Sequence, residues 1–335
     1  MSVSAHLDSA APTPVTPPSL LRQPELKVVA LVVASLICSE IGMRCLSVRL
    51  SKDVAHLAQF DEIAAEINAQ VPGDPIRVLF LGNSLTRYGV AAEPFEQAAA
   101  AAAGRPVHVV KMTPDNTALA DWFYAYRNYF AEQGRTPDLL VIGFQGPHLL
   151  DAPSIHPQRL ARFYCTADDW PDLRRDDLQG FEAQAAFVAA SHSSLLADRD
   201  RIERRALDLL IPDYQAGIQT LNERIKLHAS SSRSAVPTYH RLVRLLDLAR
   251  KNGTQVVLAA MPVPTLYDID PTLRVLAREH GAKLIDCRHV AGITDQMFPD
   301  GLHMNGEAAA CYSQHLARSL TWNASPKHVA KTPSY

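Results

Sequence analysis

Short apolar runs alternate with helical patterns from Arg77 to Leu320 of this 335-residue chain, and this alternation limits the possible folds. Five runs have the length and composition of strands: Val78–Leu81, Val107–Val110, Leu139–Ile142, Gln255–Ala260 and Lys283–Asp286. Four helical patterns lie among them or follow them: Pro94–Ala103, Leu119–Glu132, Pro271–His280 and Gly306–Leu320. Strands that are apolar throughout are buried on both faces, and intervening helices allow parallel pairing. The pattern predicts an α/β domain, residues 76–322, with a mainly parallel five-stranded sheet.

The alternation stops between residues 151 and 235, after the third strand. This stretch contains a long helical pattern, Ala183–Leu227, followed by a polar tract that begins at His228. Plain connections in compact domains are rarely longer than about 15 residues. We therefore expect a helical insertion between the third and fourth strands. Residues 49–75 have the pattern of a helical connector, and residues 323–335 that of a flexible tail.

The N-terminal region has the composition of a disordered tail over residues 1–26 and then becomes apolar. The uninterrupted apolar run, Val28–Ser39, is shorter than the ~20 residues that a membrane-spanning helix needs. Extending the run to Val48 gives enough length but includes Glu40 and Arg44, which could pair at i,i+4 spacing. We favour a single-pass anchor over residues 27–48. A cleaved signal peptide and a helix buried in the protein are the alternatives.

Two polar segments carry the candidate chemistry. The first apolar strand ends at Gly82-Asn83-Ser84, which places Ser84 at the carboxyl edge of the sheet, where ligands bind in open α/β folds. Near the other end of the chain, Asp300 and His303 are three residues apart, just before the last helical pattern. A serine hydroxyl becomes a useful nucleophile when an imidazole takes its proton and a carboxylate orients that imidazole. The two segments together predict a Ser-His-Asp triad.

The GNSL and DGLH segments at these positions resemble the motifs of the SGNH (GDSL-type) hydrolase superfamily. The resemblance implies a three-layer α/β/α sandwich of the SGNH/flavodoxin-like kind. It also implies that Ser84 is the nucleophile, His303 the general base and Asp300 the residue that orients it. With the apolar N-terminal helix, the chain looks like a membrane-anchored bacterial member of this superfamily, with its catalytic domain outside the cytoplasm.

The resemblance also indicates the groups that would stabilise the oxyanion: the backbone N–H of Ser84, a residue after the second strand, and a side-chain amide after the third. The family has a glycine at the second position, and Asn116 is the best match here because asparagine tolerates turn conformations. The third motif, GxND in the family, reads Gly-Phe-Gln-Gly, so Gln145 stands where the family has asparagine. Asn83 replaces the aspartate of the GDS motif, which is not a triad member.

The remaining features exclude other classes of function. The formal net charge of −2 provides no basic field for nucleic acid. The five cysteines and the histidines show no metal-ligand spacing, and no phosphate-binding loop is present, so we expect no metal and no cofactor. The predicted function is a serine esterase that acts on ester-linked acyl groups such as acetyl, with a small acyl ester or an acylated glycan as its substrate. An O-acyltransferase on envelope polysaccharide and an inactive binding or assembly domain are the alternatives. The sequence leaves the oligomeric state open.

Overall fold

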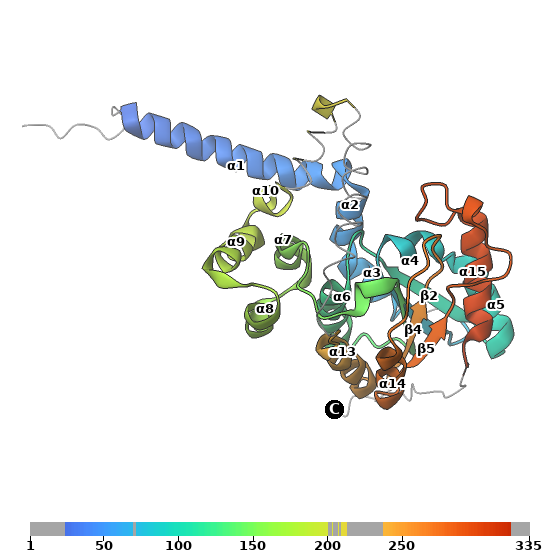
Figure 1. The fold of residues 1–335 in the computed structure, drawn as a ribbon. Coiled ribbons are helices and arrows are strands. Elements are labelled where there is room, and N and C mark those ends of the chain that lie inside the picture. The colour runs from blue at the N-terminus through green and yellow to red at the C-terminus, as the bar shows by residue number, and fades with distance from the viewer. Residues whose placement is uncertain are drawn as a thin grey trace, which may run out of the picture.

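The computed structural model describes residues 24–69, 72–199, 203, 207, 209–212 and 237–322. Its centre is one sheet of five strands: β1 (Ile76–Leu81), β2 (Val107–Met112), β3 (Leu139–Phe144), β4 (Gln255–Ala260) and β5 (Lys283–Asp286). Every neighbouring pair is parallel, and the order is β2-β1-β3-β4-β5 (Figure 1). The predicted parallel α/β sheet is confirmed. Its order reverses direction between β1 and β3, and ligands bind at such a point, beyond the carboxyl ends of the strands.

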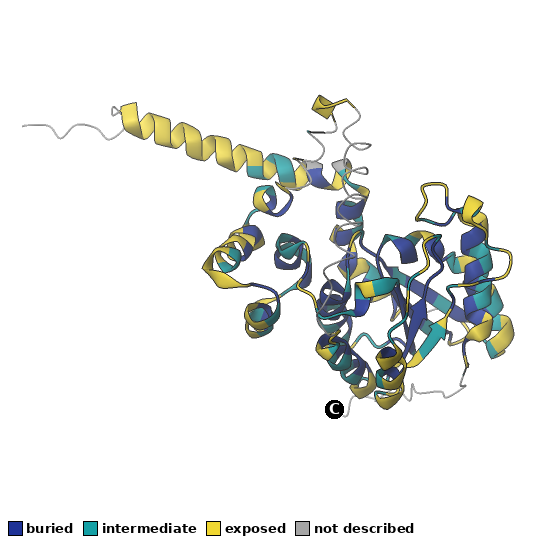
Figure 2. Cartoon of the chain, viewed as in Figure 1, coloured by how far each residue is buried: buried dark blue, intermediate teal, exposed yellow. Residues whose placement is uncertain are grey.

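Helices cover both faces of the sheet. Successive strand residues point to opposite faces, and on each face they form a hydrophobic cluster with residues of the helices. Val78 and Phe80 of β1 pack with α5 (Ala92–Ala103) and α15 (Gly306–Ser319). Leu79 and Leu81 belong to the cluster on the other face (Figure 2). The helices that contribute to that second cluster include α3 (Phe60–Glu66), α6 (Leu119–Tyr126), α13 (His240–Lys251) and α14 (Pro271–Glu279).

The predicted helices of this part agree with the structure apart from their ends. Helix α5 begins two residues earlier than predicted, while α14 and α15 each end one residue earlier. Helix α6 continues as a π-helical turn, η2 (Arg127–Ala131). Helix α13 was not predicted, although its buried apolar residues recur at helical spacing: Leu242, Leu245, Leu246 and Ala249.

The segment between β3 and β4 forms several short helices instead of one long one. They are η3 (Gly146–Leu149), α7 (Pro157–Arg159), η4 (Leu160–Tyr164), η5 (Ala167–Asp169), α8 (Trp170–Asp176), α9 (Gly180–His192) and α10 (Ser194–Ala197). The predicted helical pattern Ala183–Leu227 is therefore helical at most of its described residues but is interrupted at Ser193. Ser193 is extended, and its hydroxyl accepts the N–H of Leu196, which ends α9 and starts α10. Most of the pattern after residue 199, and the polar tract from His228 to Ser234, lie outside the described residues.

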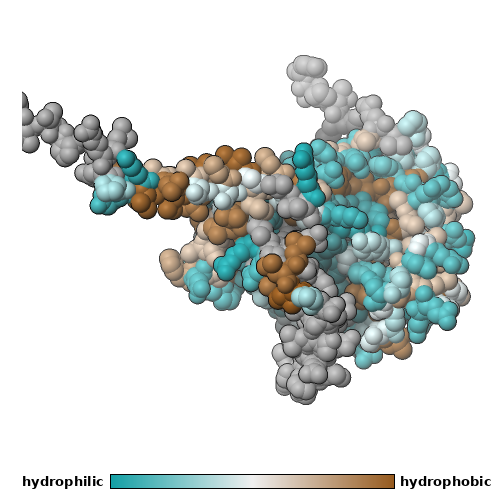
Figure 3. Space-filling model, turned by 90° about the horizontal axis from the view of Figure 1, so that it is seen from above, coloured by the Kyte–Doolittle hydropathy of each residue, from teal (hydrophilic) through white to brown (hydrophobic). Residues whose placement is uncertain are grey.

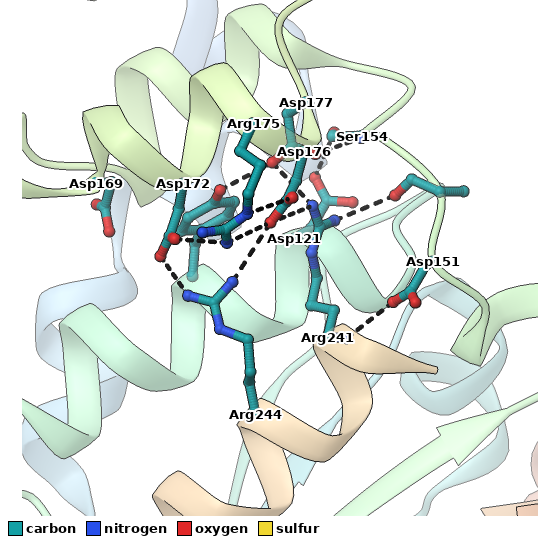
Figure 4. Close-up of polar contacts among 12 residues, drawn as sticks. Asp121, Asp151, Ser154, Asp169, Asp172, Arg175, Asp176, Asp177, Arg241 and Arg244 are labelled. Atoms are coloured by element: carbon teal, nitrogen blue, oxygen red, sulfur yellow. Dashed lines mark hydrogen bonds and ion pairs between the residues drawn. The ribbon is translucent and has the colours of Figure 1, made fainter. Parts of the chain in front are cut away.

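Ion pairs hold this segment against the body of the protein (Figure 4). Arg241 of α13 binds Asp177 at 3.0 Å, and Arg244 of the same helix binds Asp176 at 3.3 Å. Asp177 also accepts the hydroxyl of Tyr124 from α6, at 2.8 Å. A cavity of about 630 Å³ lies beside these residues. Because its arginines are already paired with carboxylates, we do not assign it to an anionic substrate.

The N-terminal helix α1 (Pro24–Leu50) is long and apolar enough to cross a membrane. It begins at Pro24, within the segment predicted to be a tail, because proline suits the first turn of a helix. The apolar side chains before Glu40 are exposed, so α1 is not a helix buried in the protein. The predicted Glu40–Arg44 pair is present, at 2.9 Å. The connector that follows consists of α2 (Lys52–Ala58) and α3; residues 1–23 and 323–335 lie outside the described part.

Thr86 fills a space at the carboxyl ends of β1 and β3 that two glycines leave open. An added Cβ would lie 1.9 Å from the Thr86 hydroxyl oxygen at Gly82, and 2.3 Å from it at Gly143. Thr86 is completely buried. The two strand ends therefore require glycine if the helix that contains Thr86 is to lie across them.

We expect Gly82→Ala to lower the free energy of unfolding by about 1–3 kcal/mol, because the new methyl group overlaps Thr86. Urea denaturation of the two proteins in the same detergent measures the difference. Gly306→Ala is the matched control, since an added Cβ there meets nothing within 4 Å. Equal losses at both positions would contradict the proposed close packing.

Candidate active site

Ser84 is the first residue of α4 (Ser84–Gly89), a short helix that begins two residues after β1. Asn83 is its N-cap, and its side-chain oxygen accepts the N–H of Leu85 at 3.0 Å. The amide nitrogen of Asn83 donates to the backbone oxygen of Thr117 at 3.2 Å. An ionised aspartate at this position could cap the helix but could not donate that second hydrogen bond. The local sequence thus places Ser84 at the carboxyl edge of the sheet.

Ser84, His303 and Asp300 form one hydrogen-bonded chain. The Ser84 hydroxyl lies 2.8 Å from Nε2 of His303, and Nδ1 of His303 lies 2.6 Å from Oδ2 of Asp300. The other carboxylate oxygen of Asp300 accepts the backbone N–H groups of Leu302 and His303, at 3.0 and 2.7 Å. These distances allow the imidazole to take the serine proton while the carboxylate holds the opposite nitrogen. The fold brings together all three residues that the sequence singled out.

Asp300 remains ionised over nearly the whole pH range. Partial burial raises the pKa of its carboxyl group, but the hydrogen bonds from His303 and Leu302 outweigh this effect and lower the pKa to about 2. The carboxylate therefore accepts the proton on Nδ1 of His303 and leaves the Nε2 lone pair directed at Ser84. With its ring proton on Nδ1, His303 has the tautomer that a general base for Ser84 requires.

The C-terminal end of α4 packs against the residue that follows β4 and against the residue that follows His303. Gly89 lies so close to Met261 that an added Cβ would be 2.6 Å from its terminal methyl, and it also neighbours Met304. Tyr88 places its ring edge-on to His303, with 5.0 Å between the ring centroids. Because half of its side-chain surface is exposed, Tyr88 is a candidate wall of the substrate site. Its position in the sequence is a signal for this role, since Tyr88 follows Ser84 by one helical turn.

Gln145 follows the last residue of β3 directly. Its backbone N–H donates to Nδ1 of His148 at 3.2 Å. Within the part of the chain that the structure describes, its Nε2 amide has no protein acceptor, so this donor is available to a ligand. Burial lowers the pKa of His148 to about 4, so the ring is neutral and can accept that bond. Both ring nitrogens also lie 3.4 Å from the Asn83 amide, which connects the ends of β1 and β3.

Asn116 has a φ of 52°, in the left-handed region that glycine adopts readily and that asparagine tolerates better than most other residues. Its side-chain amide lies 3.0 Å from Nε2 of His156. The loop before it is held by the connector helix α2. Asp53 accepts the N–H of Asp115 at 2.8 Å, and Nε2 of His56 accepts the N–H of Thr113 at 3.0 Å.

A buried cluster of charges surrounds this loop. Arg159 donates to Asp53 at 3.3 Å and to the backbone oxygen of Asp115 at 2.7 Å. Arg87, three residues after Ser84, lies 2.9 Å from the Asp115 carboxylate and 3.6 Å from that of Asp53. Sequence reasoning missed Asp53, Arg87 and Arg159. Their roles depend on contacts between α2, α4 and α7, and no local pattern indicates these contacts.

Within the residues that the structure describes, Ser84 has no direct hydrogen bond to either residue that the sequence singled out for the oxyanion. Among the described residues, no direct bond joins Ser84 to Asn116 or Gln145; the link runs through Asn83, Thr117 and His148. In the same part of the chain, no group of three or more His, Cys, Asp or Glu side chains is arranged to hold a metal ion. No protein-family model matches this chain, and no curated protein matches it.

We expect the free energy of unfolding to decrease as the pH falls from about 6.5 to about 4. Burial lowers the pKa values of both His56 and His148 from 6.5 to about 4. In this interval the unfolded chain binds protons that the folded protein does not, which favours unfolding. Urea midpoints measured at several pH values test this, and His56→Gln combined with His148→Gln should flatten the dependence. Identical slopes in parent and variant would contradict it.

Proposed function

We propose that this protein is a serine esterase of the SGNH (GDSL-type) hydrolase superfamily that cleaves ester-linked acyl groups through an acyl-enzyme on Ser84. The observation that carries the proposal is the continuous hydrogen-bond chain from Ser84 through His303 to Asp300. An accidental approach of a serine to a histidine would not also place an ionised carboxylate on the second ring nitrogen. Nucleophile, base and orienting group together are the minimum set for acyl transfer.

The architecture supports the superfamily assignment. Ser84 follows the first strand, Asp300 and His303 precede the last helix, and helices pack on both faces of the parallel sheet. We interpret the fold as a three-layer α/β/α sandwich in which the segment between β3 and β4 is a helical insertion.

In the proposed acylation step, the Ser84 oxygen attacks the ester carbonyl carbon while Nε2 of His303 takes the hydroxyl proton. The negative charge that develops on the carbonyl oxygen needs hydrogen-bond donors. The N–H of Ser84 is available, because the first N–H groups of a helix have no partner within it. We assign the other two donors to the N–H of Asn116 and the Nε2 amide of Gln145. His303 then gives its proton to the leaving alcohol oxygen.

In the proposed second step, water attacks the acyl-enzyme carbonyl and transfers its proton to His303. The bond to Ser84 breaks, the serine recovers a proton from His303, and a carboxylic acid leaves. A hydroxyl group on a glycan could replace water, in which case the same site would transfer the acyl group. Acetyl esters and acylated envelope glycans as substrates follow from the family resemblance alone.

We further propose that α1 remains attached as a single-pass membrane anchor and that the catalytic domain lies outside the cytoplasm of a bacterium. The support is that the C-terminal part of α1 contacts the folded domain. Glu40 accepts hydrogen bonds from the Ser193 hydroxyl and from the N–H groups of Ser194 and Leu195, at 2.8, 2.7 and 3.1 Å. Ser47 is buried. Cleavage on the C-terminal side of Glu40 would remove the three hydrogen bonds of its carboxylate.

We expect Ser84→Ala to reduce hydrolysis of p-nitrophenyl acetate by about three orders of magnitude or more, because the acyl-enzyme can no longer form. A fluorophosphonate probe should label the parent at Ser84 and fail to label the variant. Ser191→Ala, at an exposed serine of α9, serves as the control. Equal rates in parent and Ser84→Ala would exclude the esterase and favour a binding or assembly role. Acyl transfer to an added glycan, faster than hydrolysis, would identify a transferase.

We expect Gln145→Ala to lower kcat by about 10²–10³-fold, the usual effect of losing one oxyanion donor. Asn116→Gly should keep most of the activity, because the proposed donor is a backbone N–H and glycine adopts this left-handed conformation without strain. Steady-state kinetics on the same ester measure both effects. Full activity of Gln145→Ala, or loss of activity in Asn116→Gly, would contradict the assigned donors.

A further inference from the structure

Helix α9 is apolar on two opposite sides. On the inner side, Phe187 and Ala190 are buried, and the Phe187 ring lies 6.1 Å from that of Trp170. On the outer side, Phe181 and Val188 are 86% and 48% exposed, and the exposed Ala185 lies between them at helical spacing. A surface helix that faced only water would carry polar residues on its outer side. The outer face of α9, defined by Phe181, Ala185 and Val188, therefore calls for an apolar environment.

The position of α9 relative to α1 indicates which environment covers this face. Arg44 of α1 approaches the backbone oxygen of His192, the last residue of α9, at 3.4 Å. Glu40 binds the start of α10, as described above. In Figure 1, α10 lies next to α1, and α9 lies on the side of α10 that is nearer the N-terminal end of α1. The two contacts hold the end of α9 and the start of α10 against α1 at Glu40 and Arg44, just beyond its apolar part.

The length of α1 places the bilayer at the level of these contacts. The part of the helix from Pro24 to Ser39 is about 24 Å long at 1.5 Å per residue. The hydrocarbon core of a bilayer is about 30 Å thick. A bilayer that holds α1 must therefore extend past Glu40, to the level at which α9 and α10 are bound. Figure 3 shows the hydrophobic surface of α1 standing clear of the main body of the protein.

We propose that the outer face of α9 inserts into the same lipid bilayer that holds α1, so that the protein contacts the membrane at two places. The proposal rests on the membrane attachment proposed above and is independent of the esterase chemistry. Glu40 can lie at this level because three hydrogen bonds from α10 and the pair with Arg44 satisfy its charge. The second contact would prevent the catalytic domain from rotating freely about its anchor.

Tryptophan fluorescence in vesicles tests the proposal. The full-length Phe181→Trp variant is reconstituted into phosphatidylcholine vesicles with or without brominated acyl chains, which quench nearby tryptophan. Interfacial helices lie about 5–10 Å into the boundary between headgroups and acyl chains, so shallow bromines should quench Trp emission at position 181 more than deep ones. Val275→Trp, at a 43% exposed position on α14, is the matched control and should lose no intensity. The signal of the three native tryptophans is subtracted using the parent protein.

A second pair of variants tests the role of the Glu40 contacts. Combining Phe181→Trp with Glu40→Ala should reduce the quenching at position 181 while the protein still floats with the vesicles. Glu25→Ala, in the first turn of the same helix, should leave the quenching unchanged.

Three outcomes would overturn one proposal or the other. Vesicle-bound protein whose position 181 shows no quenching by brominated lipid would overturn the α9 proposal. Protection of that position from an aqueous quencher without quenching by lipid would also overturn it, and would indicate a protein partner or a second copy. Protein that does not float with vesicles at all would overturn the anchor itself. None of these outcomes bears on the esterase proposal, which the hydrolysis of p-nitrophenyl acetate tests separately.

Discussion

The contact of Thr86 with Gly82 and Gly143 sets the geometry on which the candidate site depends. Because neither glycine carries a side chain, the six-residue helix α4 can lie directly against the ends of β1 and β3. Its first residue is Ser84, the proposed nucleophile, and its last, Gly89, packs against Met261 and Met304, the residue after His303. One short helix thus helps to fix the distance between Ser84 and His303, which are 219 residues apart in the chain.

The N-terminal helix α1 is connected to the candidate site through the helix that follows it. Helix α1 is followed by α2, whose Asp53 and His56 hold the loop that ends at Asn116. Arg87 joins the same charge cluster from α4. Burying several charges is costly unless each is paired, and here every carboxylate of the cluster faces an arginine. The cluster therefore ties the connector to both the nucleophile helix and the proposed oxyanion loop.

Sequence patterns predicted the sheet, and they predicted a helical segment between β3 and β4 but not the breaks within it. Each strand contains a short apolar run, and polar or turn residues lie around it, so its place is encoded locally. The break between α9 and α10 is different. Glu40 accepts the N–H groups of Ser194 and Leu195 from more than 150 residues away, which satisfies the start of a new helix. A helical pattern read through Ser193 cannot reveal such a partner. The sequence of helix α13, by contrast, has a clear helical spacing of apolar residues.

The sequence by itself determined the parallel α/β class and the three residues of the triad. Strand length, the glycine turn before Ser84 and the spacing of Asp300 and His303 are all local properties of the chain. Only the tertiary structure decided the surroundings of that triad, which include neutral His148 bound to the backbone of Gln145 and the charge cluster around Asp53. It also decided that Arg44 of α1 lies at the end of α9. These contacts join segments distant in sequence, and strand order and helix packing, which no local pattern specifies, bring them together.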